Sequence, residues 1–209
     1  MFRKVLAAVL ALADAPQAVN PGMPKGPQVL EVDAGASEVT VHVGKAGLLS
    51  FAGHTHEVAA HRLAGQVVVD PSEPGRSSVS LRVEAAGLTV VADSESPQDV
   101  PKVQETMSGP RVLDVGRFPE IAFDSTRVEA TQRSDGGWDA VVTGSLRIRD
   151  RARPIRVEGR VEVQKGRLVA TGKVSVRQTD FGIQPVTVAG VVKVKDELVV
   201  SWRIVARPR

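Results

Sequence analysis

The sequence predicts an all-β domain, either a closed barrel or a sandwich of about eight strands. Apolar residues alternate with other residues at a period of two in almost every segment after residue 38. The apolar residues are mainly Val, Ala and Leu, and the β-branched Val suits a pleated, half-buried surface. A chain of 209 residues is an ordinary length for one such domain.

Each expected strand carries a stripe of apolar side chains on one face. The stripes lie in residues 39–43, 67–69, 79–83, 121–123, 138–148, 155–163, 168–176 and 198–204. Residues 70–75, 134–137 and 165–166 are rich in turn-forming Gly, Pro, Asp and Ser, and they separate strands. Gly144, Gly159 and Gly172 fall on the stripes, where we expect them to permit curvature and to leave interior room.

One segment departs from this pattern and predicts a short helix near residues 100–108. Asp99 is expected to cap it, and Pro101 falls in the first turn, where a missing N–H does no harm. Val103 and Met107 share one face of this helix. The pair at 109–110, Gly-Pro, is expected to end it.

The N-terminus predicts export. Two basic residues precede a short apolar run, and Ala11-Leu12-Ala13 supplies a small-residue cleavage pattern. We therefore expect a signal peptide over 1–13, a Pro- and Gly-rich flexible leader over 14–29, and the folded β-barrel domain over 30–209. The expected localisation is periplasmic or secreted, and the alternative is a frayed helix in a cytoplasmic protein.

Composition removes several classes of function. The formal net charge is only +3 and aromatic residues make up 3%, which argues against a nucleic-acid partner, because single-strand binders combine basic grooves with stacking aromatics. The chain contains no Cys, which excludes disulfides and thiolate chemistry. No nucleophile elbow and no phosphate-binding Gly-rich loop is present, so we expect no enzyme and no catalytic residues.

Three of the four His lie close together, at His54, His56 and His61. On a strand, residues two apart point to one face, so His54 and His56 could both reach a divalent transition metal, the possible cofactor here. The spacing of the flanking Gly and Glu does not fit a cupin. The alternative is that these His lie at a barrel mouth and hydrogen-bond to loop backbone.

A basic hairpin is the other charged feature. Strict alternation would place Arg147, Arg149, Arg151 and Arg153 on one face, opposite Leu146. That face could contact lipid phosphate or an anionic membrane surface, and the alternative is a solvated outer face.

Five fragments in order resemble the YceI-like family of bacterial lipocalin-like barrels. They begin near residue 32 and include Leu63-Ala64-Gly65-Gln66-Val67 and the runs at 117–125, 144–155 and 178–183. The match covers about residues 31–206. The chain departs from the family at 102–107, at Asp150 and at the His-x-His sequence, which looks like a His-containing branch. The resemblance implies an antiparallel lipocalin-like β-barrel of about eight strands with one short helix.

The resemblance also implies that the barrel holds an apolar lipid, an isoprenoid or acyl chain. Phe51, Phe123 and Phe181 are the residues expected in the wall of the ligand cavity. Two alternatives remain open at this point. One is a His-based metal or redox protein, and the other is a structural or stress-related module whose interior is filled by its own side chains. Oligomeric state is left open.

Overall fold

The computed structural model describes residues 26–46, 56–92, 97–164, 166–188 and 192–209. These residues form twelve strands, one α-helix and short 3-10 turns. The strands are β1 (Gln28–Val32), β2 (Glu38–Ala46), β3 (His56–Ala60), β4 (Leu63–Val69), β5 (Ser78–Glu84), β6 (Leu88–Val90), β7 (Glu120–Gln132), β8 (Trp138–Ile148), β9 (Arg151–Gln164), β10 (Arg167–Arg177), β11 (Thr187–Val188) and β12 (Val192–Pro208). The helix is α1 (Val100–Ser108), and Gln178–Phe181 form the 3-10 turn η5.

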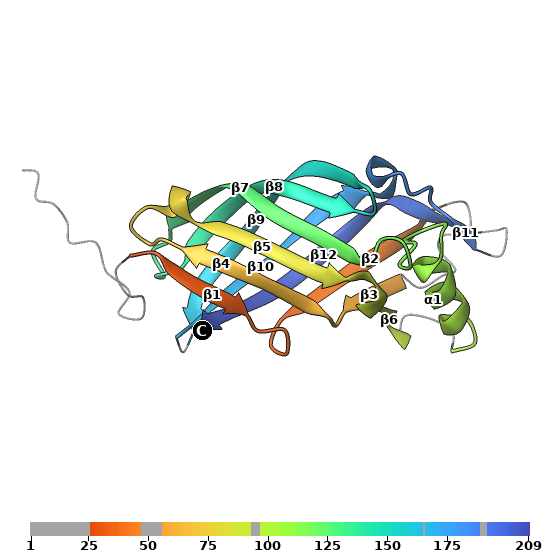
Figure 1. The fold of residues 1–209 in the computed structure, drawn as a ribbon, viewed down its shortest axis with the longest axis horizontal. Coiled ribbons are helices and arrows are strands. Elements are labelled where there is room, and N and C mark those ends of the chain that lie inside the picture. The colour runs from red at the N-terminus through yellow and green to blue at the C-terminus, as the bar shows by residue number, and fades with distance from the viewer. Residues whose placement is uncertain (1–25, 47–55, 93–96, 165, 189–191) are drawn as a thin grey trace, which may run out of the picture.

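Eight strands close into a barrel (Figure 1). Their order is β1-β4-β5-β7-β8-β9-β10-β12, and β1 closes the ring by pairing with the end of β12, as in Val32 with Ala206. The described pairings are all antiparallel. The prediction of an antiparallel barrel of eight strands is therefore confirmed.

The set of ring strands differs from the expected stripes in one member. Residues 39–43 belong to β2, which is not one of the eight ring strands. β2 pairs with β12, β3 pairs with β2, and β6 pairs with β3. The ring closes instead through β1, which includes Gln28 and Val29 of the expected leader. The long β12 makes this possible, because it pairs with β2 along most of its length and with β1 over its last residues.

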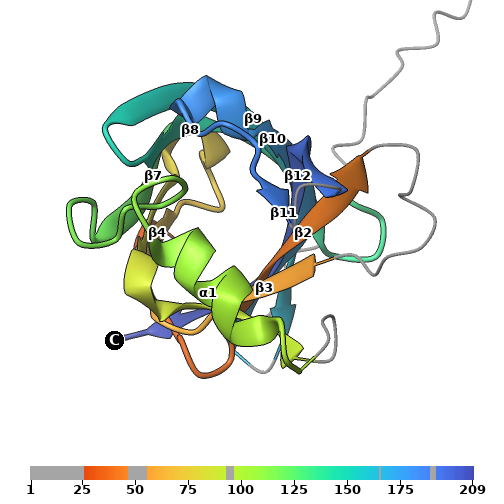
Figure 2. The ribbon, with the colours of Figure 1, turned by 90° about the vertical axis from the view of Figure 1, so that its right-hand side faces the viewer.

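Helix α1 has the bounds that the sequence predicts, and it lies across one end of the barrel (Figure 2). The expected cap by Asp99 is wrong. Its side chain makes no capping hydrogen bond, because its backbone (φ −93°, ψ −21°) is already helical rather than extended as a capping residue requires. Gln104 fastens the helix to β6 instead: its amide donates to the Leu88 carbonyl (3.0 Å) and accepts from the Val90 N–H (2.9 Å).

The glycines on the apolar stripes do not leave open room, contrary to expectation. A Cβ at Gly172 would lie 2.4 Å from Cζ2 of Trp202 and 2.6 Å from the Glu158 carbonyl oxygen. At Gly144 it would lie 2.6 Å from Cζ of Phe123. The space above each glycine is filled by an aromatic ring from another position of the sheet.

The expected single face of arginines is also wrong. Arg151 pairs with Ile148 and Arg153 pairs with Leu146, and paired residues of antiparallel strands share a face. The two-residue turn at 149–150 pairs even-numbered residues of β8 with odd-numbered residues of β9. Arg151 and Arg153 therefore lie on the face of Leu146 and Ile148, and Arg147 lies on the other face. Arg149 has a positive φ of 56° in this turn.

Candidate functional site

The barrel encloses a cavity of about 570 Å³, within the size range of small-molecule sites. Seven of the eight ring strands contribute to its lining, together with β2, β3, β6 and α1. Among the described lining residues, seven carry a charge, a hydroxyl or a side-chain amide, and the remainder are apolar or glycine. The polar ones are Asp70, Ser77, Lys102, Thr106, Arg111, Arg177 and Gln178.

The cavity lies between packed regions at the two ends of the barrel. One end is filled by Leu30, Val67, Leu168 and Ala206, where β1 closes the ring. At the other end, apolar residues of α1 and the following loop pack against β3 and β6 and against the segment around η5. The middle of the barrel is not filled by the described side chains. The residues that line it face the lumen and are half-exposed there.

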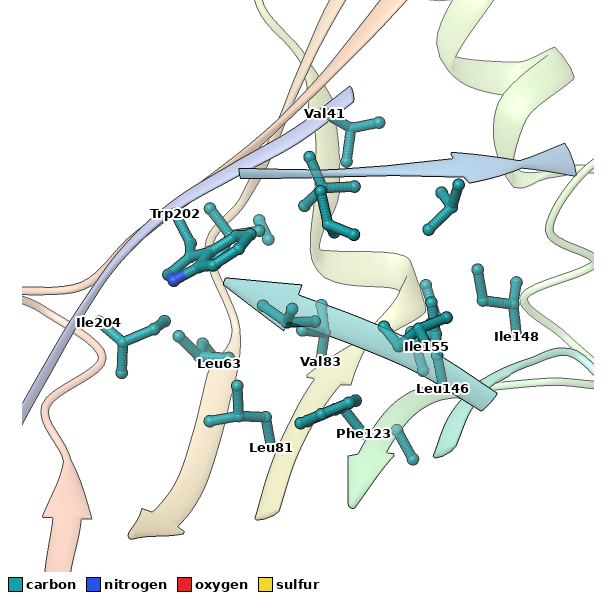
Figure 3. A pocket seen from close by; sticks show the side chains of 18 of the residues that line it. Val41, Leu63, Leu81, Val83, Phe123, Leu146, Ile148, Ile155, Trp202 and Ile204 are labelled. Atoms are coloured by element: carbon teal, nitrogen blue, oxygen red, sulfur yellow. The ribbon is translucent and has the colours of Figure 1, made fainter. Parts of the chain in front are cut away.

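Aromatic rings lie against the wall of the cavity. Trp202 covers Gly172, its direct partner across the β10–β12 ladder, and Phe123 covers Gly144 on the next strand. Figure 3 shows both rings among Leu, Ile and Val side chains that line the same space. Each ring lies where a side chain at the glycine position would otherwise be. The glycines thus allow the two large rings to lie against the wall of the cavity.

Two of the three phenylalanines expected at the cavity lie in its lining. Phe123 comes from β7, and Phe181 comes from η5, where it is 2% exposed and packs with Val176 and Ile183. Phe51 lies outside the described residues.

The metal hypothesis is not tested by the described residues. His54 lies outside them, and so does the side chain of His56, whose backbone begins β3 opposite Val43. His61 is exposed, and its backbone N–H donates to the Gly87 carbonyl (3.2 Å). The described part of the chain contains no group of three metal-ligating side chains. Metal binding at His54 and His56 stays a prediction.

Sequence reasoning missed His42, which joins three strands. Its Nδ1 lies 3.2 Å from the Glu57 carboxylate on β3, and its Nε2 lies 3.0 Å from the Ser201 hydroxyl on β12. Both ring nitrogens are thus engaged within the sheet.

The charged residues of the cavity lining are unevenly placed. Lys102, Arg111 and Arg177 come from α1, the loop after it, and the end of β10, all at the end of the barrel that α1 crosses (Figure 2). Asp70 follows the end of β4, on the side away from α1 (Figure 1). No local sequence signal marks the three cations, because they belong to separate segments.

One carboxylate oxygen of Asp70 is held by the turn that follows it. Its Oδ1 accepts hydrogen bonds from the Ser72 hydroxyl (2.6 Å), the Ser72 N–H (3.0 Å) and the Glu73 N–H (3.0 Å). The Ser72 and Glu73 hydrogen bonds lower the pKa of this carboxyl group, which therefore remains ionised.

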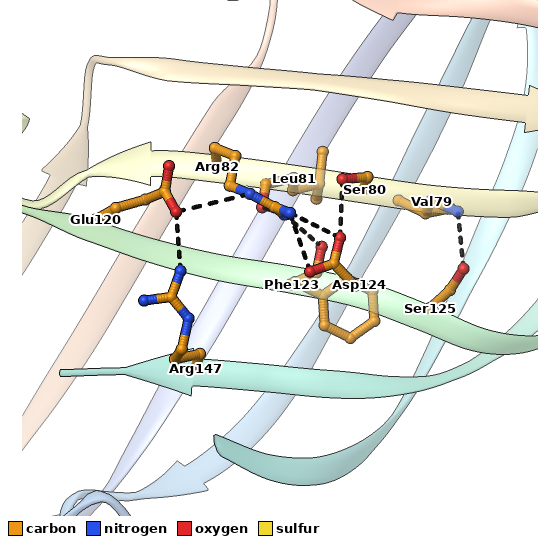
Figure 4. Close-up of polar contacts among 9 residues, drawn as sticks. All are labelled: Val79, Ser80, Leu81, Arg82, Glu120, Phe123, Asp124, Ser125 and Arg147. Atoms are coloured by element: carbon orange, nitrogen blue, oxygen red, sulfur yellow. Dashed lines mark hydrogen bonds and ion pairs between the residues drawn. The ribbon is translucent and has the colours of Figure 1, made fainter. Parts of the chain in front are cut away.

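The outer face of the same wall carries paired charges (Figure 4). Arg82 on β5 binds both carboxylate oxygens of Asp124 on β7 (2.9 and 3.0 Å), and Glu120 accepts from Arg147 on β8 (2.9 Å). Desolvation raises the pKa of Asp124, but the hydrogen bonds from Arg82 and Ser80 outweigh it and the net pKa is lowered. These pairs connect three strands outside the lumen.

Strands β9 and β10 separate near the α1 end. Their pairing stops at Glu158 and Lys173, and a second hollow of about 500 Å³ lies between the separated halves. Arg177 and Phe181 border both this hollow and the main cavity. The buried ring of Phe181 thus stands at the boundary between the two.

A family model described as a YceI-like domain matches residues 30–206. The chain belongs to the YceI-like family. No curated protein sequence matches it. Among solved structures, the YceI-like barrel is similar to BcnA of Burkholderia cenocepacia, with 18% identity, a TM-score of 0.63, and coverage of 83% of this chain and 98% of that one.

Two further solved structures show the same fold. A polyisoprenoid binding domain from Saccharophagus degradans, implicated in plant cell wall breakdown, matches with 11% identity and a TM-score of 0.64, covering 86% of this chain and 98% of that one. The YCEI protein of Campylobacter jejuni matches with 10% identity and a TM-score of 0.56, covering 73% and 84%. In the described residues, no helix has both the length and the apolar character needed to span a membrane.

Proposed function

We propose that this YceI-like protein binds an apolar lipid, an isoprenoid or acyl chain, inside its barrel and does not transform it. The observation that carries the proposal is the lining of the 570 Å³ cavity, which is apolar except near its ends. The Saccharophagus neighbour, described as a polyisoprenoid binding domain, supports the same class of ligand. Among described lining residues there is no His, Glu or Cys, so the lining offers few of the usual acid–base or nucleophilic groups.

The physical driving force is the removal of apolar ligand surface from water. Each buried CH₂ contributes about 0.8 kcal/mol, so ten methylenes contribute about 8 kcal/mol before the entropy lost on binding. Affinity should therefore rise with tail length until the lumen is filled.

The test is native mass spectrometry of protein purified without added lipid, followed by titration with a fluorescent polyprenyl or fatty-acyl probe. We expect co-purified lipid and saturable binding of the probe. If the probe does not bind saturably to lipid-free protein, the structural-module alternative replaces the proposal.

We also propose that the protein acts in the periplasm or outside the cell, on the strength of the basic and apolar N-terminal residues and Ala11-Leu12-Ala13. N-terminal sequencing of natively expressed protein should give a mature chain that begins near Asp14. An intact Met1 in the soluble cytoplasmic fraction contradicts this.

A further inference from the structure

We propose that Lys102, Arg111 and Arg177 form a binding site for the anionic headgroup of the lipid, a phosphate or carboxylate, at the α1 end of the barrel. This inference rests on the proposed function and adds the class of headgroup and its position. The apolar tail occupies the lumen, and the charged head remains at the end that α1 crosses (Figure 2).

The distribution of charge along the cavity is the first observation. Of the four charged residues in the described lining, the three cations gather at one end, and the single carboxylate, Asp70, lies toward the other. Asp70 is kept ionised by its turn, so the end beyond β4 disfavours an anion. An amphipathic anion is therefore oriented with its head toward α1.

The second observation is that these cations are available. Within the described part of the chain, none of the three forms an ion pair with a carboxylate, and each is exposed. Arg177 is the least free of the three, because it pairs with Glu197 across the ladder. Desolvation raises the pKa of Asp196, but the Thr179 hydrogen bonds and the charge of Arg177 together lower it. By contrast, Arg82 and Arg147 on the outer wall are matched by Asp124 and Glu120. An anionic headgroup would supply Lys102 and Arg111 with a partner through charge-assisted hydrogen bonds, and Arg177 would add a third positive charge.

The third observation is that the cations are carried on fixed elements. Lys102 lies one turn before Thr106 on the helix that Gln104 fastens to β6, and both Lys102 and Thr106 line the cavity. A site built on fixed elements loses less entropy when it orders a ligand.

The loop that carries Arg111 is also held in place. The Leu113 N–H donates to the Met107 carbonyl (3.0 Å), and an Arg149 guanidinium nitrogen donates to the Val112 carbonyl (3.4 Å). Val112 and Leu113 pack into the two apolar clusters at this end.

The experiment compares lipids that differ only in the headgroup. The pairs are geranylgeranyl phosphate with geranylgeraniol, and hexadecanoate with hexadecanol, titrated at low and high salt. We expect the wild-type protein to bind at least one anion about tenfold more tightly than its alcohol, with a preference that shrinks as salt rises. The phosphate and carboxylate arms show which headgroup the cations prefer.

Two double variants with equal loss of charge supply the control. K102Q/R111Q should remove most of the tenfold preference for the anion, and adding R177Q should remove the remainder, while affinity for the alcohol stays unchanged. R160Q/K173Q removes two exposed cations from the outer faces of β9 and β10 and should leave the preference intact. Circular dichroism verifies that each variant is folded. If the double variant does not fold, the single variants K102Q and R111Q are measured in its place.

The outcomes separate the two proposals. If the alcohols bind saturably but neither anion is preferred, or if both double variants have equal effects, the headgroup site is refuted and lipid binding stands. If neither alcohols nor anions bind, lipid binding itself is refuted, and the headgroup site with it.

Discussion

Filling the middle of the lumen should abolish lipid binding without unfolding the barrel. Val142 on β8 and Val157 on β9 are direct partners across the ladder, both line the cavity, and both are half-buried. Neither belongs to the packed apolar clusters at the barrel ends. Val142→Phe and Val157→Phe would therefore place two rings side by side in open lumen rather than in a filled core.

The size of the effect follows from the ligand surface that each ring displaces. If one ring excludes about four methylenes of the tail, the loss is about 3 kcal/mol, or about a hundredfold in Kd. The two rings lie at the same level of the lumen, so the double variant should exclude the chain altogether. The stability of the fold should change by only about 1 kcal/mol, because the added groups enter free space.

A fluorescent acyl probe measures binding, and denaturant unfolding measures stability. Val141→Phe is the matched control, because Val141 is adjacent on β8 but is absent from the cavity lining and pairs with Glu158. This variant should bind the probe as the wild-type protein does. Undiminished binding by the folded V142F/V157F double variant would refute the placement of the tail in this lumen.

Three further predictions concern stability. Gly172→Ala should destabilise the barrel by about 2 kcal/mol in denaturant unfolding, because its Cβ would lie 2.4 Å from Cζ2 of Trp202 and 2.6 Å from the Glu158 carbonyl oxygen; an unchanged midpoint would contradict these two close approaches. Asp70→Ala should lower the melting temperature by several degrees, whereas Asp70→Asn, which keeps an acceptor oxygen, should lower it less. Hydrogen bonding to Arg133 lowers the pKa of Asp135 from 3.8 to about 2. The stabilisation from this ion pair is therefore present above pH 3.8 and lost as pH falls toward 2. Asp135→Asn should flatten the melting temperature across that range, and an equally steep fall in the variant would contradict the pair.

The long strands and the helix could be predicted because their signals are local. Strands β8, β9, β10 and β12 each carry four or more apolar positions at a period of two, enough to establish both strand and face. The helix bounds follow from Pro101 and from the Gly-Pro that ends it. Strands β3, β6 and β11 were missed because five, three and two residues are too few to show a period.

The candidate site could not be predicted in the same way, because it depends on contacts between distant positions. The sequence alone predicts free space inside the barrel at Gly172. The pairing of β10 with β12 places Trp202 opposite this glycine, and the indole ring fills that space. Lys102, Arg111 and Arg177 are ordinary exposed cations in their own segments. The crossing of α1 over the barrel end brings Lys102 and Arg111 to the cavity end where β10 places Arg177.

The two parts of the cavity would select a ligand by different physical means. An apolar wall distinguishes chains mainly by length, since one methylene more or less changes the free energy by about 1 kcal/mol and similar chains of equal length are separated weakly. Charged groups at the α1 end discriminate more sharply, because an anion forms charge-assisted hydrogen bonds with them and a neutral head does not. Tail length would then set how tightly a lipid is held, and the headgroup would set which lipids are held. For this reason the comparison between an anion and its own alcohol, which have the same tail, measures the contribution of the cations at the α1 end and leaves the contribution of the lumen constant.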